Sequence, residues 1–299
     1  MSALSRFNDY LSLVKFSHTV FALPFALVGF TLGIVHKNDQ FSWAWFSANW
    51  PLFVKVLLCM VFARSAAMAF NRYLDRRFDA MNPRTAKREI PAGVISPGNA
   101  LLFTIINCLL FIITTWFINN TVFYLSFIAL FVILFYSYTK RITALCHIVL
   151  GVGLSLAPIG AYLSVTNRFD LLPVLFSLIV LTWVSGFDII YALQDEEFDR
   201  EQRLHSIPAA LGKRGALNVS NLLHLVCAAM VVAAGIYGGF NWVFWAGAAV
   251  FIGLLFYQHI LVSPDDLSRV NMAFANTNGI ASIVFAIFTI TSLIIQPYL

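Results

Sequence analysis

Long apolar stretches recur along the whole chain, and they limit its possible folds more than any other feature. Several approach the roughly 20 residues that a helix needs to cross a bilayer. They lie near residues 16–36, 51–70, 100–117, 121–138, 147–165, 171–192, 217–236, 241–262 and 278–296. Because backbone groups in lipid must find hydrogen-bond partners within their own segment, each stretch is expected to be helical. The sequence therefore predicts an all-α integral membrane protein with about nine transmembrane helices.

The composition supports lipid as the main solvent. Hydrophobic residues make up 60% of the 299 residues and charged residues only 11%, whereas soluble domains carry about 25% charged residues. The ten-residue alternation that is typical of membrane barrels is absent. The four cysteines stand singly, without metal-ligand spacing, so we expect neither disulfides nor structural zinc. A soluble domain, a barrel and a disulfide scaffold are thus all disfavoured.

Basic residues gather on one side of the predicted membrane segments. They follow the second, fourth, sixth and eighth stretches: Arg72, Arg76, Arg77, Arg84, Lys87, Arg88, Lys140, Arg141, Arg200, Arg203, Lys213, Arg214 and Arg269. Since positive residues favour the cytoplasmic side, we expect a cytoplasmic N-terminus and a multi-pass protein of the inner (cytoplasmic) membrane. Topology thus explains the formal charge of +5, and no nucleic-acid partner is needed.

Two polar loops stand out, near 71–99 and 193–216. Each follows an even-numbered stretch, is long for a link between neighbouring helices, and mixes acidic with basic residues. We expect both loops to cap the cytoplasmic side of a helical bundle. The central cavity of that bundle is expected to open sideways to lipid. The whole chain, 1–299, is expected to form a single transmembrane domain.

Each of these loops begins with regularly spaced acidic residues. Asn71, Asp75 and Asp79 are four residues apart, and so are Asp195 and Asp199. On a continuing helix this spacing places the side chains on one face. Like charges at that spacing destabilise a helix unless a cation neutralises them, and Mg²⁺ commonly binds through one or two carboxylates plus phosphate oxygens. The two clusters, with Lys and Arg around them, therefore predict a site for Mg²⁺ and a diphosphate.

The sequence resembles the UbiA superfamily of intramembrane prenyltransferases over essentially its whole length. Besides the aspartate motifs, three stretches carry the resemblance. They are Asn82-Pro-Arg-Thr-Ala-Lys-Arg-Glu-Ile-Pro-Ala-Gly93, similar to the family's RTxxRPLPxG; Tyr136-Ser-Tyr-Thr-Lys140-Arg141, similar to its YxxxKR; and Asp188-Ile-Ile-Tyr191-Ala-Leu-Gln-Asp195, similar to its DxxYAxxD. Within the superfamily, the chain is most similar to 4-hydroxybenzoate polyprenyltransferases and to prenyltransferases of the futalosine route to menaquinone.

The resemblance implies transfer of a polyprenyl group from its diphosphate to an aromatic acid. Two Mg²⁺ ions would be held by Asp75, Asp79, Asp195 and Asp199, with Asn71 assisting, and Asp75 and Asp195 are expected to be essential for catalysis. Fixed cations would stabilise the charge that grows on the departing diphosphate. The implied cations are Lys15, Arg84, Arg88 and Lys140.

The resemblance also implies roles on the side of the acceptor. Asp188 would help to deprotonate the hydroxyl or the ring of the acceptor, and Arg141 would bind its carboxylate as a two-pronged donor. Aromatic faces can stabilise the allylic cation; the candidates are Tyr136, Tyr138, Phe187 and Tyr191. The expected partners are polyprenyl diphosphate, a small aromatic acceptor and membrane lipid, with no obligatory protein partner.

Some questions stay open from the sequence. Where many family members have a lysine before a serine, this chain has His205 before Ser206, which puts phosphate binding there in doubt. Arg64 shares the face of Asn71, two helical turns earlier, without an assigned role. The acceptor is either 4-hydroxybenzoate or a dihydroxynaphthoate, and other branches of the superfamily or a transporter are alternatives. Prenyl length and oligomeric state are not readable.

Overall fold

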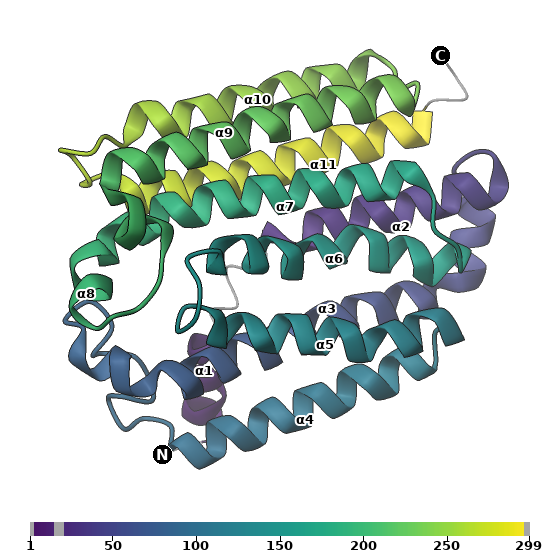
Figure 1. Cartoon of the computed structure of the whole chain (residues 1–299). Coiled ribbons are helices and arrows are strands. Elements are labelled where there is room, and N and C mark those ends of the chain that lie inside the picture. Colours follow the sequence, from purple (N-terminus) through teal and green to yellow (C-terminus); the bar gives the residue numbers. More distant parts are fainter. Residues whose placement is uncertain (1–2, 15–20, 296–299) are drawn as a thin grey trace.

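The computed structural model describes residues 3–14 and 21–295, and within these ranges nearly every long element is helical. The helices lie side by side as a bundle (Figure 1). They are α1 (Ala3–Leu13), α2 (Leu23–Asn38), α3 (Trp43–Met81), α4 (Pro97–Trp116), α5 (Asn120–Thr139), α6 (Cys146–Thr166), α7 (Leu171–Ala192), α8 (Glu196–Glu201), α9 (Ile207–Tyr237), α10 (Trp242–Leu261) and α11 (Asn278–Ile295). A short 3₁₀ turn, η2 (Leu193–Asp195), precedes α8, and a π-helical turn, η3 (Met272–Thr277), precedes α11.

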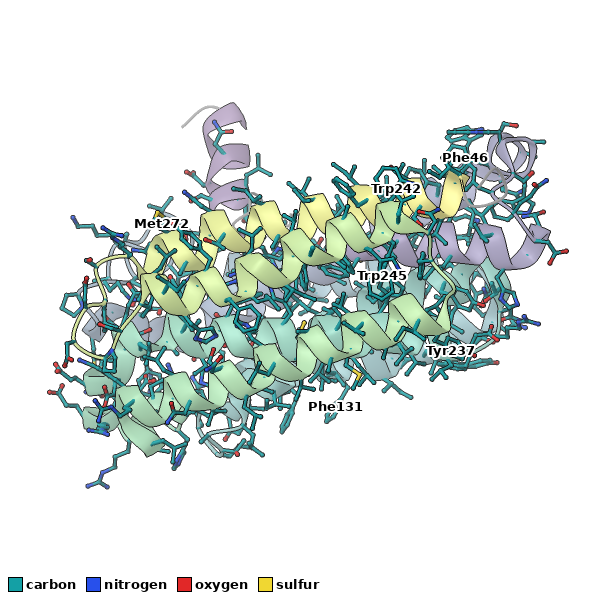
Figure 2. The ribbon with its side chains drawn as sticks, turned by 90° about the horizontal axis from the view of Figure 1, so that it is seen from above. Phe46, Phe131, Tyr237, Trp242, Trp245 and Met272 are labelled. Carbon is teal, nitrogen blue, oxygen red and sulfur yellow. The ribbon has the colours of Figure 1, made fainter. Side chains whose placement is uncertain are left out.

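The prediction of an all-α membrane bundle is confirmed. In the described ranges, eight helical segments are long and apolar enough to cross a membrane. The first predicted stretch coincides with α2, which has 16 residues and is shorter than a typical span. Outward-facing side chains such as Phe131, Tyr237 and Trp242 lie on the perimeter of the bundle (Figure 2). The exact number of spans and the cytoplasmic N-terminus remain predictions.

A large core cluster lies between α2, α7, α9, α10 and α11. Its large side chains include Phe25, Trp183, Phe251 and Phe285, all fully buried. Phe25 and Trp183 pack with ring centroids 5.3 Å apart, and Phe251 stacks on Phe285 at 4.8 Å. On the opposite side of the bundle, α4 and α5 bury far fewer of their residues. One half of the molecule is therefore closely packed, whereas α4 and α5 expose more of their surface.

Helix α6 lies between these two halves, and two helices of the packed half approach it closely. A Cβ atom at Gly29 of α2 would lie 2.0 Å from the carbonyl oxygen of Pro158 in α6. A Cβ atom at Gly151 of α6 would lie 2.5 Å from the carbonyl oxygen of Leu181 in α7. Both distances are too short for a side chain, so glycine is required for this close approach of the backbones.

The two aspartate motifs lie on different kinds of helix end. Helix α3 continues without a break beyond its membrane-spanning part to Met81, and it ends at Asn82, directly before Pro83, a residue type whose predecessor is disfavoured in helices. In contrast, α7 ends at Ala192, and the chain passes through η2 into α8. The connection 82–96, η2 and α8 all lie at the same end of the bundle (Figure 1). The two predicted polar loops are thus partly helical.

Candidate functional site

A polar pocket of about 170 Å³ lies at the end of the bundle where both aspartate motifs are found. Helices α3, α5, α6, α7 and α8 contribute to it, together with the connection 82–96. The predicted site residues that line it are Asn71, Asp75, Asp79, Arg84, Arg88, Tyr136, Lys140, Asp188, Tyr191, Asp195 and Asp199. Residues more than a hundred positions apart therefore meet at one site.

The first motif lies along one face of α3, as its spacing predicts. The Asn71 side-chain amide donates to Asp75 Oδ2 at 3.1 Å. Asp75 Oδ1 accepts from Arg141 Nη2 at 2.8 Å, and Asp79 Oδ1 accepts from Arg88 Nη1 at 2.6 Å. The other oxygen of Asp79, Oδ2, is buried and has no partner among the described residues. The first motif thus retains an acceptor atom that is free to bind a further group.

The second motif is more fully bonded. Asp195 accepts from the Asn82 side-chain amide at 3.0 Å and from Arg84 Nε at 3.0 Å, and it also pairs with Arg84 Nη2. Asp199, whose side chain is completely buried, accepts from the Ser206 hydroxyl at 2.8 Å and lies 2.7 Å from Lys140 Nζ. These partners come from other segments, so they tie η2 and α8 to the connection 82–96, to the end of α5 and to the start of α9.

Each of the four motif aspartates therefore faces one basic side chain. Burial alone would lower the pKa of Lys140, but its contact with the Asp199 carboxylate outweighs burial and raises that pKa above its usual value. At Arg84, burial likewise lowers the pKa and the Asp195 carboxylate raises it, and the net effect is a raised pKa. Both side chains accordingly stay positively charged at neutral pH, as a diphosphate site requires.

The donor atoms fit a hard divalent ion that arrives together with phosphate. In the described parts of the chain, no three acidic, histidine or cysteine side chains are close enough to form a complete metal site by themselves. Carboxylate oxygens from two motifs are nevertheless available, including the unpartnered Asp79 Oδ2. Mg²⁺ typically takes one or two carboxylates and completes its shell with water and substrate phosphate oxygens. The residues present match that incomplete type of site.

An apolar pocket of about 320 Å³ adjoins the polar one. It is bounded mainly by α3, α4, α5 and α6, and Tyr136 lines both pockets. Arg64 is the basic residue among its lining side chains, and the Arg64 Nε atom is buried without a partner in the described ranges. The site thus combines a charged compartment, an apolar compartment and a tyrosine at their junction.

Several sequence predictions are refined by these positions. Arg141 pairs with Asp75 and donates to the carbonyl oxygen of Leu74 at 3.2 Å, and it does not line the polar pocket. Phe187 is buried in the core, and Tyr138 is 46% exposed; neither lines the two pockets. Lys15 lies outside the described residues.

His205 contributes to the structure through its main chain. Its side chain is exposed, and its backbone N–H donates to the carbonyl oxygen of Lys140 at 2.7 Å. In the described structure, this residue therefore fixes the loop before α9 through its main chain.

Three residues of the site were missed as functional candidates. Asn82 bonds Asp195, Ser206 bonds Asp199, and His147 Nδ1 lies 2.7 Å from Asp188 Oδ2. Asn82 and Ser206 stand at helix boundaries, where short polar side chains are common for local reasons. His147 is a single histidine at the start of an apolar stretch, and no spacing marks it. Only the fold brings these residues to the motifs.

Comparisons with known proteins place the chain in a family. The chain matches the model of the UbiA prenyltransferase family over residues 18–287. A 4-hydroxybenzoate octaprenyltransferase of Tolumonas auensis is 31% identical over 223 residues, which cover 75% of this chain and 78% of that relative. Another protein of the same name, from Aliivibrio salmonicida, is 29% identical over 263 residues, covering 84% of this chain and 90% of the relative.

Solved structures show the same fold. An apo UbiA homologue from Aeropyrum pernix K1 superposes with a TM-score of 0.76 at 28% identity, covering 94% of this chain and 98% of that one. A UbiA homologue from Archaeoglobus fulgidus, bound to GPP and Mg²⁺, gives a TM-score of 0.70 at 20% identity, covering 95% and 99%. These matches set aside the alternative of a transporter. The chain belongs to the UbiA prenyltransferase family and is a prenyltransferase enzyme.

Proposed function

We propose that this protein transfers a polyprenyl group from its diphosphate to the ring of a 4-hydroxybenzoate-type acid, as a step of ubiquinone biosynthesis in the inner membrane. The observation that carries the proposal is the convergence of both aspartate motifs and three flanking cations on one pocket, beside an apolar pocket. The names of the relatives from Tolumonas auensis and Aliivibrio salmonicida favour this acceptor. Prenylation of a dihydroxynaphthoate for menaquinone is the alternative outcome of the test below.

The polar pocket suits the diphosphate of the donor. Mg²⁺ held by carboxylates of the two motifs would neutralise the phosphate oxygens and favour departure of the diphosphate. Arg84, Arg88 and Lys140 already lie in the pocket, paired with aspartates. When the diphosphate binds, each of these cations moves from its carboxylate to a phosphate oxygen. Each positive charge therefore keeps a negatively charged partner. Because charge on the leaving group grows during the reaction, these cations stabilise the transition state more than the ground state.

The reaction then requires a short sequence of bond changes. The carbon–oxygen bond between the allylic carbon and the diphosphate breaks, and its electron pair leaves with the diphosphate. The ring carbon next to the acceptor's hydroxyl forms a carbon–carbon bond with the allylic cation. Asp188 takes the proton that the ring or its hydroxyl releases. Tyr136, at the junction of the pockets, presents an aromatic ring to the cation.

For the acceptor's carboxylate, the structure favours Arg64 over Arg141. Arg141 already donates to Asp75 and to the carbonyl oxygen of Leu74. Arg64 lines the apolar pocket, and in the described ranges no ion pair reaches its guanidinium. A charged group surrounded by apolar side chains is costly unless it is paired, and a carboxylate-bearing ring provides both the pairing charge and an apolar body. We therefore assign the acceptor's carboxylate to Arg64.

The decisive experiment incubates membranes containing the protein with Mg²⁺, a labelled long-chain prenyl diphosphate and each aromatic acid in turn. Prenylated 4-hydroxybenzoate alone supports the proposal, product from a dihydroxynaphthoate alone supports the menaquinone alternative, and product from neither acid refutes both. Arg64→Leu is expected to raise the KM for the acid about tenfold or more, with the KM for the prenyl diphosphate unchanged. Lys37→Leu, in the last turn of α2 and outside both pockets, serves as the matched cation control.

A further inference from the structure

The carboxylate of Asp188 differs from the four motif carboxylates in its partner. Each motif aspartate faces a lysine or an arginine, whereas Asp188 is paired with a histidine, His147, at the start of α6. The His147 Nδ1 atom lies 2.7 Å from Asp188 Oδ2. His147 is 3% exposed and Asp188 is 19% exposed, and both line the polar pocket. The histidine thus lies behind the aspartate, which faces the pocket.

The N-terminus of α9 determines which nitrogen of His147 carries the hydrogen. The backbone N–H of Ile207, the first residue of α9, points at His147 Nε2 from 3.4 Å. The first N–H groups of a helix have no partner within the helix, so they seek an acceptor elsewhere. A donor can face only a nitrogen that has a free lone pair. Nε2 is therefore unprotonated, and the hydrogen resides on Nδ1, where it is donated to Asp188.

With the hydrogen on Nδ1, the histidine donates to the aspartate and holds its carboxylate in one orientation. One carboxylate oxygen, Oδ2, is engaged by His147, and in the described structure no side chain or backbone group bonds the other oxygen, Oδ1. A histidine donor fixes the direction of the carboxylate through a single oxygen, whereas an arginine can bind both oxygens at once. The carboxylate consequently remains a competent proton acceptor that points in one direction.

From these contacts we infer that His147 is a positioning residue for the reaction: it orients Asp188 so that the free Oδ1 receives the proton released by the aromatic acceptor. The inference rests on the proposed function for the identity of the acceptor. Asp188 is the catalytic base, and His147 acts through it. The proton moves from the ring or hydroxyl of the acceptor to Asp188 Oδ1, while the Nδ1 hydrogen of His147 stays in place.

The role of His147 predicts a specific defect, because the base acts after or apart from ionisation of the donor. In His147→Leu, formation of the prenylated acid should fall about tenfold to a hundredfold, within the range of general-base catalysis. Release of diphosphate should fall much less, because the allylic cation is then captured by water, giving a prenyl alcohol and a proton. The ratio of prenyl alcohol to prenylated acid should therefore rise.

The assay uses the full-length protein in detergent, with Mg²⁺, tritium-labelled geranyl diphosphate and 4-hydroxybenzoate. His147→Gln, whose amide can both donate to Asp188 and accept from Ile207, should restore most of the coupling. The matched control is His259→Gln, in the histidine pair that His259 forms with His224 at 2.9 Å between α9 and α10, away from both pockets. Equal loss of both products in His147→Leu, or no loss of either, would overturn the inference.

Two further measurements separate this inference from the proposed function. In an Asp188→Asn background, His147→Leu should cause no further decrease in the formation of prenylated acid. An additive decrease would show that the two residues act independently. In ¹⁵N NMR spectra of histidine-labelled protein, assigned with His147→Gln, His147 should carry its proton on Nδ1 alone. A protonated Nε2 would refute the positioning role, even if the acceptor is not 4-hydroxybenzoate. If the wild-type protein prenylates no aromatic acid, only the proposed function is refuted.

Discussion

The first aspartate motif lies on a continuous helical stretch of α3, well after the kink at Asn49, whereas the second lies across a junction between two helices. Asp75 and Asp79 are on α3 and have side-chain exposures of 25% and 8%. Asp195 ends η2 and Asp199 lies in α8, with exposures of 12% and 0%. The second motif also has more partners, and the first retains the free Oδ2 of Asp79. The comparison suggests that the first motif is built to receive a ligand and the second to hold the site together.

The largest expected effect concerns what the two motifs share. Asp75→Ala and Asp195→Ala should each lower turnover by at least about a hundredfold to a thousandfold, because each variant removes a carboxylate that would hold the Mg²⁺ needed to neutralise the departing diphosphate. Both variants should still insert into the membrane. The measurement is prenyl transfer from a labelled diphosphate at saturating Mg²⁺. Glu197→Gln, an exposed acid on α8, is the control and should keep its activity. Near-normal turnover in either alanine variant would take that residue out of the site.

A second prediction distinguishes the two motifs by how much each contributes to the stability of the protein. Asp199→Ala leaves Lys140 without its partner and removes the bond to Ser206, so it should lower the free energy of unfolding by about 3 kcal/mol. Asp79→Ala breaks only a pair with Arg88, which is partly exposed, and should cost about 1 kcal/mol or less. Thermal unfolding in detergent without Mg²⁺ compares the two. If Asp79→Ala is the more destabilising variant, the proposed division of roles is incorrect.

The smallest expected effect concerns Ser206, which accepts from the backbone N–H of Ala209 as the N-cap of α9 and donates to Asp199. Ser206→Ala should cost about 1 kcal/mol of stability and reduce turnover only modestly. Ser206→Thr retains the hydroxyl and is the control. The same unfolding and transfer assays apply. A loss of turnover as large as that of Asp195→Ala would mean that Ser206 contacts the substrate, in conflict with its present assignment.

The sequence predicted the first motif well because its geometry is local. Four-residue spacing on a continuing helix places Asn71, Asp75 and Asp79 on one face, and α3 does continue through all three. The break before Asp195 carries no glycine or proline and was not predictable from local preferences. Which cation faces which aspartate depends on packing of distant segments, as Arg84 and Asp195 show. The same reason explains why the contact between His147 and Asp188 was missed.

The membrane-spanning segments show the same limit of prediction from sequence, in which local properties are predictable and long-range contacts are not. Hydropathy located nearly every spanning segment, because apolar composition is a property of each segment by itself. No role was assigned to Arg64 from the sequence, and the role expected of Arg141 at the acceptor's carboxylate stays a prediction, because charge and position along the chain do not reveal the partner of a basic residue. Only the partners of Arg141 distinguish them: it is already bonded to α3. Sequence therefore identified the set of charged residues, and the fold determined which of them remain available.

The close approaches at Gly29 and Gly151 have a mechanical consequence. At both glycines the backbones are in close contact, so a shift of α6 toward α2 or α7 would make backbone atoms collide. The apolar pocket, which α6 bounds on one side, is bounded elsewhere by α3 and by α4 and α5. The outer faces of α4 and α5 are covered with exposed apolar side chains. In a membrane this wall therefore borders the acyl chains directly, and an apolar group that widens the pocket on that side must displace lipid as well as protein.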